Sequence, residues 1–265
     1  MLVDHWVRGM NKRRGKILLG SVALGCGVAM AAVVAARNAE AGKSLMASHM
    51  DSAEAQDAKY VVWATKIEAP KSTDGLPGDE DWSKAEAIRF NADWQGKNAD
   101  PERETEVRVL WTPETLFLKY HVKYKTITVF ADSEPNGRRD KLWDRDVVEA
   151  FLQPDPSVLH SYKELEFSPN NMWIDLDIAE RQGRDLKSGL TRRVTMDEGN
   201  KTWTAMAALP MKSLVNRFDA MAVWRVNFYR IEGAGEPRFY SAWSATRTEK
   251  PNFHVPEAFG FLRFR

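Results

Sequence analysis

Three short segments of the chain set carboxylates among large apolar side chains. The first, LWDRDVVEAFL (142–152), contains Glu149 between Val147 and Phe151 on a predicted strand. Successive side chains of a strand point to opposite faces, so these three residues are expected to share one face. A charged group between apolar neighbours is costly unless it is paired with a cation or kept wet by a binding groove. Glu149 is therefore either a paired strand-edge carboxylate or a ligand contact.

Acidic and apolar residues alternate in the next two segments, YKELEF (162–167) and MWIDLDI (172–178). Strand alternation predicts that the apolar residues of both segments point to a core and the polar ones to the opposite, solvent-facing side. That side would carry Glu164, Glu166, Trp173, Asp175 and Asp177. If these strands neighbour the first segment, one sheet face brings several carboxylates together with aromatic rings.

Such a face suits a sugar, because hydroxyls donate to carboxylates while the C–H surface of a sugar stacks on aromatic rings. The same pattern also fits the ordinary polar outer face of a half-exposed sheet. A glycosidase would need two carboxylates about 5–10 Å apart across a cleft, and Glu149 with Glu166 or Asp175 could form such a pair. The sequence contains no G-x-S-x-G, H-E-x-x-H, Walker or G-x-G-x-x-G motif that would indicate another chemistry.

The segments that carry these residues belong to a longer series of short alternating runs. From Tyr60 onward about eleven such runs are separated by Pro, Gly, Asn and Asp. This pattern predicts an all-β fold, an antiparallel two-sheet β-sandwich of the jelly-roll or immunoglobulin-like kind. Helix-linked parallel strands are excluded because the sequence has no helical crossovers. A short helix is expected only in MKSLVNRF (211–218), after Pro210.

The N-terminus is typical of an export or anchor helix. An uncharged run from Ile17 to Ala36 follows a basic segment, and it is long enough to span a bilayer. This charge pattern predicts that the rest of the chain lies outside the cytoplasm, in the periplasm or outside the cell. Residues 1–41 are then either a signal peptide, cleaved after a small-x-small site at 39–41, or a membrane anchor through residues 17–36. Residues 42–59 are expected to be a flexible linker, and residues 60–265 the folded domain.

The charge balance and the cysteine content argue against a nucleic-acid-binding protein and against a fold held by disulfides. The chain has 38 Lys and Arg against 37 Asp and Glu, a net charge of +1 that argues against a nucleic-acid-binding surface. Cys26 is the single cysteine, so no disulfide can form within the chain. Ten tryptophans leave some large rings available for stacking on a ligand.

Five segments together resemble the family 9 carbohydrate-binding modules, which are related to DOMON-type sandwiches. They are residues 143–152, YKELEFSPNNMWIDLDI (162–178), WRVNFYRIE (224–232), FYSAW (239–243) and PNFHVPEAFGFLRF (251–264). The resemblance covers about 67–265 and keeps the order of the family's motifs. It implies an antiparallel β-sandwich that holds the end of an oligosaccharide or polysaccharide between two aromatic rings and supports carbohydrate catabolism.

The resemblance also implies a binding site. One ring opens the W-x-x-D-x-x-E motif of residues 143–149, and the other precedes the last strand, where this chain has Phe253 rather than Trp. Glu166 stands where well-described members have an arginine contact, and Asn227 where they have an amide contact. The implied carbohydrate-binding residues are Trp143, Asp146, Glu149, Glu166, Asn227, Phe253 and His254.

Calcium is a possible cofactor, since members of this group can carry it near their N-terminal strands. In DGLPGDEDW (74–82), Asp74, Asp79 and Asp81 offer the hard oxygen ligands that calcium prefers. Their spacing is not that of an EF-hand loop, and solvated turn residues are the competing interpretation.

Haem b is the alternative cofactor, because DOMON-type sandwiches can hold it through Met, His or Lys side chains. Met172, Met206 and His160 could be recruited for that purpose. Covalently attached haem is excluded, since the sequence has no C-x-x-C-H motif.

Overall fold

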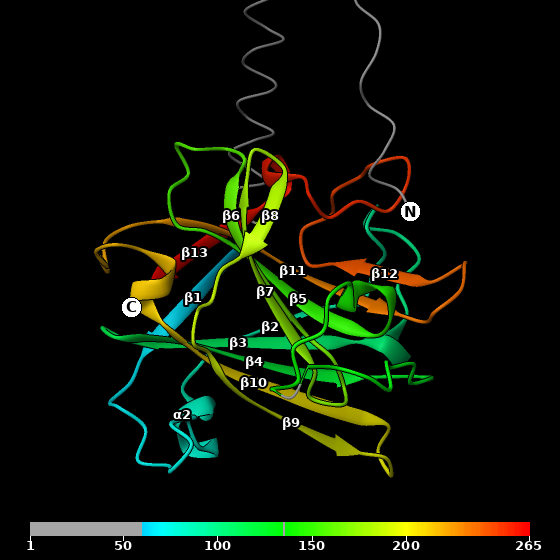
Figure 1. Ribbon diagram of the computed structural model, residues 1–265, viewed down its shortest axis with the longest axis horizontal. Helices are drawn as coiled ribbons and strands as arrows, with labels where there is room; N and C mark the ends of the chain where they lie inside the picture. Colours follow the sequence, from blue (N-terminus) through cyan, green and yellow to red (C-terminus); the bar gives the residue numbers. More distant parts are fainter. Residues whose placement is uncertain (1–59, 135) are drawn as a thin grey trace, which may run out of the picture. The chain divides into compact units, whose positions relative to one another are not determined.

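Strands account for most of the secondary structure in residues 60–134 and 136–265, the part of the chain that the computed structural model describes (Figure 1). The strands are β1 (Val61–Lys66), β2 (Ala87–Phe90), β3 (Thr105–Thr112), β4 (Thr115–Lys123), β5 (Val147–Gln153), β6 (Ser161–Phe167), β7 (Trp173–Ala179), β8 (Gln182–Asp185), β9 (Thr191–Asp197), β10 (Thr202–Pro210), β11 (Trp224–Glu232), β12 (Phe239–Ala242) and β13 (Gly260–Phe264). The helices are α2 (Asp79–Ser83), α3 (Met211–Leu214) and the 3-10 turns η1 (Pro101–Arg103), η2 (Leu142–Asp144) and η3 (Pro256–Ala258). The predicted all-β class is confirmed.

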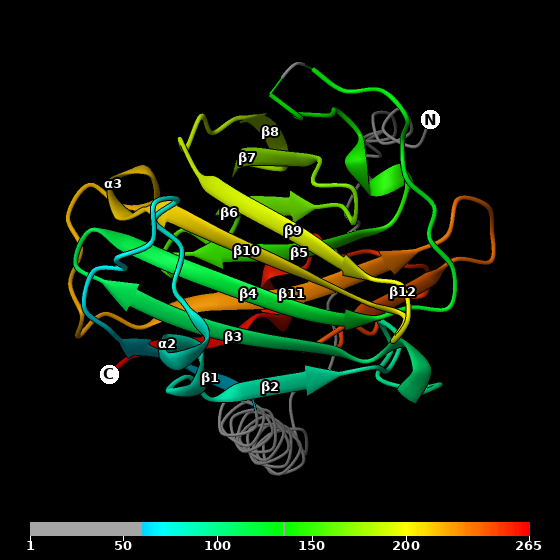
Figure 2. The same cartoon turned by 90° about the horizontal axis from the view of Figure 1, so that it is seen from below.

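These strands form one curled sheet in the order β8-β7-β6-β5-β11-β13-β1-β3-β4-β10-β9, with β12 beside β11 and β2 beside β3. Figures 1 and 2 show its two halves as layers that face each other. β1 joins the halves, because its first residues pair with β13 and its last two with β3, both in parallel. The prediction of two separate, wholly antiparallel sheets therefore needs correction: the layers are sandwich-like, but a shared strand connects them.

The main core lies between the two layers. Alternate residues of β5 and β6, among them Val148, Ala150 and Leu165, pack against Val107 and Leu118 of β3 and β4. All five side chains are fully buried. Burial of a Val or Leu side chain contributes about 1.5–3 kcal/mol, so this interdigitation holds the layers together.

A second apolar cluster, called here the outer cluster, covers the opposite face of β5, β6, β7 and β11. Its buried members are Leu142, Val147, Phe151, Tyr162, Met172, Ile174, Ile178, Tyr229, Ile231, Ala242, Phe253 and Phe259. Phe253 and Phe259 come from the segment before β13, and Leu142 comes from η2, so these irregular segments lie over the sheet. As a result β5 is buried on both faces.

The register of β6 and β7 corrects the predicted polar face. Glu166 lies opposite Ile174, and Glu164 lies opposite Leu176. Residues directly opposite each other share a face, so both glutamates point to the side of the apolar β7 residues. The polar residues of β7 point to the other side: Trp173, Asp175 and Asp177. The prediction that all five polar residues share one face was wrong, because alternation orders each strand separately while the turn between strands sets their register.

Both short helices follow local signals. α3 begins directly after Pro210, within the predicted segment. α2 was not predicted; it buries Trp82, whose indole N–H donates to the carbonyl of Pro77 at 3.0 Å.

The predicted signal or anchor segment (1–41) and linker (42–59) lie outside the described residues. Within the described ranges, no helix has the length and apolar character needed to cross a membrane.

Candidate functional site

Three glutamates from β5 and β6 form a buried group, called here the glutamate cluster: Glu149, Glu164 and Glu166. Glu149 lies directly opposite Glu166 in the antiparallel pair, and Glu164 is two residues from Glu166 on the same face. One carboxylate oxygen from each residue lies within 4.8 Å of the other two. The residues are 2%, 4% and 0% exposed, respectively. The sheet thus brings three acids together beneath its surface.

The glutamate cluster is electrostatically strained. Burial raises the pKa of Glu149 and Glu166 well above the ordinary value, and the neighbouring carboxylates raise it further. Burial also raises the pKa of Glu164, although the nearby His254 partly opposes this. No ion pair formed by the described residues includes a cluster member, while both oxygens of Glu166 and one of Glu164 have no hydrogen-bond partner. Such groups concentrate at functional sites.

Aromatic rings of the outer cluster surround the carboxylates. Phe151 stacks on Tyr162 with ring centroids 5.3 Å apart, and it meets Tyr229 edge-on at 5.0 Å. Tyr229 itself lies directly opposite Glu149 on the neighbouring strand. The glutamate cluster is therefore surrounded by apolar rings, and this low-dielectric environment strengthens any electrostatic interaction within it.

Trp143 lies at the edge of this region, in η2. Its neighbour Leu142 is buried in the outer cluster and anchors the turn. The Trp143 side chain is 36% exposed, and it is the one aromatic among the exposed large hydrophobic residues of the described chain. Its backbone carbonyl accepts a hydrogen bond of 2.6 Å from Arg238, whose guanidinium also lies over the ring of Tyr240. The Trp143 side chain is thus partly open to solvent, while its backbone is fixed by Leu142 and Arg238.

Phe253 and His254 differ in accessibility. The Phe253 ring is 7% exposed and stacks on Tyr229, with centroids 4.2 Å apart and an interplanar angle of 11°. His254 is exposed, and its Nδ1 shares a hydrogen bond of 2.7 Å with the Tyr162 hydroxyl. Its ring lies 5.3 Å from that of Phe151. The structure therefore packs Phe253 into the outer cluster and leaves His254 at the surface.

Asp146 is buried and fully engaged. Its two carboxylate oxygens accept hydrogen bonds from the backbone N–H groups of Gly233, at 2.6 Å, and Thr128, at 3.0 Å. Burial raises its pKa to about 6 in spite of these bonds. Asp146 ties the loop before β5 to the end of β11, and both oxygens are already occupied.

Asn227 is also fully engaged. Its side-chain N–H groups donate to the Ser244 carbonyl at 2.8 Å and the Tyr229 hydroxyl at 2.9 Å. Its side-chain oxygen accepts from the backbone N–H groups of Phe228 and Ser244. These bonds fasten the segment after β12 to β11, so the amide serves the fold.

The structure adds three residues to those implied by sequence: Glu164, Tyr162 and Arg238. The E-x-E spacing of β6 placed Glu164 beside Glu166 on one face, and this was the signal for it. Tyr162 shares that face by the same alternation. Arg238 gave no signal, because only the folded β11–β12 turn carries it to Trp143.

The three aspartates considered for calcium do not meet. Asp74 pairs with Arg193 at 2.6 Å, and Asp81 pairs with Lys84 at 3.1 Å. The Asp79 side chain is 99% exposed. Within the described residues, the glutamate cluster is the single group of three acidic, His or Cys side chains close enough to share an ion.

Two of the three residues considered for haem, Met172 and Met206, lie in different clusters, and His160 lies in the loop between β5 and β6. Met172 is buried in the outer cluster. Met206 packs on a third apolar cluster, formed around Leu110 and Phe117 on the other half of the sheet. Because Met172 and Met206 belong to separate clusters, they cannot ligate one iron from two sides.

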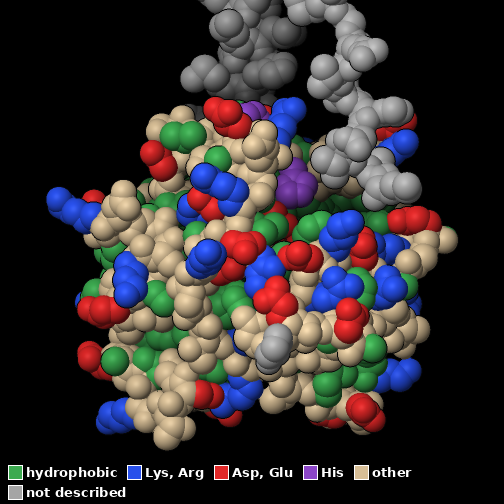
Figure 3. Space-filling model, in the orientation of Figure 1, with side chains coloured by type: hydrophobic (Ala, Val, Ile, Leu, Met, Phe, Trp, Pro, Cys, Tyr) green, Lys and Arg blue, Asp and Glu red, His purple; other side chains and the backbone are tan. Residues whose placement is uncertain are grey.

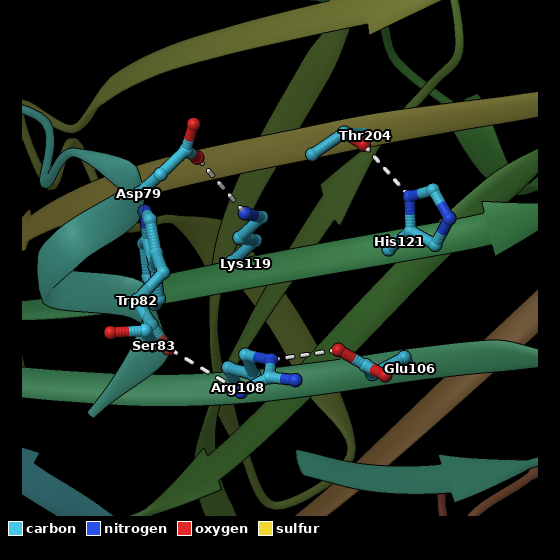
Figure 4. A pocket seen from close by; sticks show the side chains of 8 residues that line it. All are labelled: Asp79, Trp82, Ser83, Glu106, Arg108, Lys119, His121 and Thr204. Atoms are coloured by element: carbon cyan, nitrogen blue, oxygen red, sulfur yellow. Dashed lines mark hydrogen bonds and ion pairs between the residues drawn. The ribbon is translucent and has the colours of Figure 1, made fainter. Parts of the chain in front are cut away.

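A surface groove of about 280 Å³ lies on that other half, between α2 and the strands β3, β4 and β10 (Figure 4). Its side chains pair largely with one another: Lys119 with Asp79 at 3.8 Å, Arg108 with Glu106 at 2.7 Å, and His121 with Thr204 at 3.1 Å. The face shown in Figure 3 likewise intersperses acidic and basic side chains. Neither the groove nor this face concentrates side chains of one charge sign that could bind an oppositely charged ligand.

Comparisons with known proteins identify related chains and folds. The family model described as carbohydrate family 9 binding domain-like matches residues 73–265. An extracellular protein of Arthroderma benhamiae is 23% identical over 192 residues, which cover 66% of this chain and 85% of that protein.

Solved structures share the fold. A candidate carbohydrate-binding protein from Bacteroides uniformis superposes with a TM-score of 0.63 at 19% identity, covering 78% of this chain and 99% of that one. A family 9 carbohydrate-binding module from Caldicellulosiruptor kristjanssonii, in complex with cellotriose, gives 0.54 at 14% identity, covering 77% and 93%. Its complex with glucose gives 0.55 at 14% identity, covering 77% and 95%. At these identities the similarity shows a shared fold.

Proposed function

The chain belongs to the carbohydrate family 9 binding domain-like family, as its motifs predicted, and from this membership we propose that it binds carbohydrate at the outer face of β5 and β6. The structures of the related module from Caldicellulosiruptor kristjanssonii are complexes with cellotriose and with glucose. Glucose and short glucans are therefore the first ligands to test on this chain.

One observation carries the proposal: an exposed tryptophan lies in η2, the turn that leads into β5, and β5 carries Glu149 of the buried glutamate cluster. Trp143 supplies the stacking surface, and the carboxyl groups of Glu149 and Glu166 supply hydrogen-bonding groups. A ring stack contributes about 0.5–1.5 kcal/mol beyond area burial, and a hydrogen bond to a carboxyl group about 0.5–1.5 kcal/mol. Together these terms can hold one sugar residue.

In this proposal the sugar lies in a slot with two walls. Trp143 forms one wall, and the segment before β13 forms the other. Phe253 supports this wall by stacking on Tyr229, while the adjacent His254 is exposed and available to the ligand. Asp146 and Asn227 hold the surrounding segments in place through bonds that are already complete. The glycan end would then lie between Trp143 and the Phe253–His254 segment.

We also propose that the domain acts outside the cytoplasm and supports carbohydrate catabolism. The basic segment and the apolar run at Ile17–Ala36 are the reason for the location. If the run is not cleaved, it would anchor the domain in the membrane.

The test is a glycan array followed by calorimetric titration of the full-length chain in mild detergent. We expect saturable binding of at least one sugar, with cellotriose and glucose as reference ligands. A correctly folded chain that binds no glycan on the array would contradict the proposal.

A further inference from the structure

The glutamate cluster has the geometry of an ion site as well as of a hydroxyl acceptor. Glu149, Glu164 and Glu166 project from two paired strands, so their positions are fixed by the sheet rather than by a loop. One oxygen from each lies within 4.8 Å of the other two. Three oxygens within that span can all contact a single ion placed between them.

A second observation concerns Glu166 alone. The residue is 0% exposed, and its two oxygens receive no hydrogen bond from any described residue outside the cluster, because their one polar neighbour is the Glu164 carboxyl. A buried carboxylate without donors is costly, and nearly all buried polar groups in folded proteins are partnered. The unpartnered oxygens therefore point to a missing donor or cation at this position.

The surrounding side chains do not supply that partner. Arg238 is turned toward the backbone carbonyls of Trp143 and Arg145, and His254 is bonded to Tyr162. No described ion pair reaches the cluster, and the rest of its surroundings is the apolar outer cluster. Arg238 and His254 act on Glu149 and Glu164 without forming an ion pair, so the negative charge that the cluster can carry is compensated only in part.

We propose that Glu149, Glu164 and Glu166 bind a divalent cation of the size of calcium. Calcium takes oxygen ligands at about 2.3–2.6 Å, so three oxygens spaced evenly around one ion lie about 4.0–4.5 Å apart, which falls within the 4.8 Å span of the cluster. Magnesium demands near-ideal octahedral ligands at about 2.0–2.1 Å, which two rigid strands do not offer. Two positive charges would offset most of the cluster's charge, and water would complete the coordination.

The inference goes beyond sugar binding, because it concerns the ion alone and needs no glycan. Calcium can be titrated into the full-length chain in mild detergent after dialysis against EDTA and then chelator-free buffer. We expect one calcium ion per chain by calorimetry and a higher melting temperature with calcium than with EDTA.

The matched variants are Glu166→Gln, in the cluster, and Asp79→Asn, among the aspartates of the alternative calcium segment. Glu166→Gln removes one of three like charges with little change in shape. In EDTA it should melt above wild type, whereas in calcium it should gain nothing and bind the ion at least tenfold more weakly. Asp79→Asn should behave as wild type in both conditions. Glu164→Gln is a second cluster variant. It too should melt above wild type in EDTA and gain no stability from calcium.

The possible outcomes separate cleanly. Calcium uptake that is lost in the two glutamate variants and kept in Asp79→Asn supports the site. Absence of calcium uptake by the wild-type chain overturns it, as does uptake that the glutamate variants retain. A chain that binds calcium but no glycan would refute the proposed function and leave this site standing.

Discussion

Glu149 and Glu166 face each other across the antiparallel pair of β5 and β6, and neither side chain is more than 2% exposed. Like charges directly opposite each other in a sheet are destabilising. The strand is nevertheless well held, because the Tyr120 hydroxyl donates to the Glu149 backbone carbonyl at 2.8 Å from across the main core. The fold thus supports an unfavourable pair at the place where we propose ligand binding.

Trp143→Ala should weaken glycan binding by roughly tenfold or more, because one decade corresponds to about 1.4 kcal/mol and the ring supplies a stack. The melting temperature should change little, since the ring is 36% exposed. Calorimetry and thermal unfolding measure the two effects. Trp63→Ala, a half-buried tryptophan of β1, is the matched control and should keep full affinity. Unchanged affinity in Trp143→Ala would remove this ring from the site.

Phe253→Ala should destabilise the fold by about 3–5 kcal/mol, as large-to-small changes in buried positions do. The reason is the loss of its stack on Tyr229. Denaturant unfolding measures this, and Phe253→Leu should lose much less because it retains most of the volume. If Phe253→Ala kept wild-type stability and lost only the glycan, Phe253 would instead be an open wall of the slot.

Hydrolysis of aryl glycosides by the purified chain should be undetectable. Retaining glycosidases separate their carboxyl groups by about 5–5.5 Å and inverting ones by about 6.5–9.5 Å, with the substrate between them. Here oxygens of the three glutamates lie within 4.8 Å of one another and are buried. Turnover that disappears in both Glu149→Gln and Glu166→Gln would show that the cluster is catalytic.

Asp146 should make stability depend on pH. Burial raises its pKa from 3.8 to about 6, with Glu232 adding to the rise and Arg230 opposing it. An acid whose pKa is higher in the folded state stabilises the fold fully below pH 4 and loses that contribution as pH rises to about 6. The loss is on the order of 2–3 kcal/mol, from 1.36 kcal/mol per pKa unit.

The measurement is denaturant unfolding of wild type and Asp146→Asn between pH 4 and pH 7. Asn cannot accept from both Thr128 and Gly233, so the variant should be less stable throughout. Its deficit relative to wild type should shrink across this window as the charged wild-type carboxylate appears. A deficit that is constant with pH would mean that Asp146 does not titrate there.

The N-terminal segment should place the domain outside the cytoplasm. A reporter that is active only in the cytoplasm, fused after Arg265, should be inactive, because positive residues before an apolar run stay on the cytoplasmic side. The same fusion without residues 1–41 is the control and should be active. Activity of the full-length fusion would contradict the predicted export.

The sequence by itself determined the relations within each strand. Alternation correctly placed Glu149 with Val147 and Phe151, and Glu164 with Glu166, because side chains of a strand must point to alternate faces. Pro210 likewise marked α3. Family motifs identified the chain through residues that recur in a fixed order, which requires no three-dimensional information.

Tertiary structure decided how these strands and loops meet. Whether Glu164 and Glu166 share a face with Asp175 depends on the β6–β7 register, which is set by a turn and not by either strand's pattern. Whether Phe253 and Asn227 are free for a ligand depends on partners far away in the sequence, such as Tyr229 and Ser244. A solvent-facing polar strand and a strand covered by a folded loop show the same alternation. The segment before β13 and the η2 turn, packed over β5 and its neighbours, turned an outer face into a buried glutamate cluster.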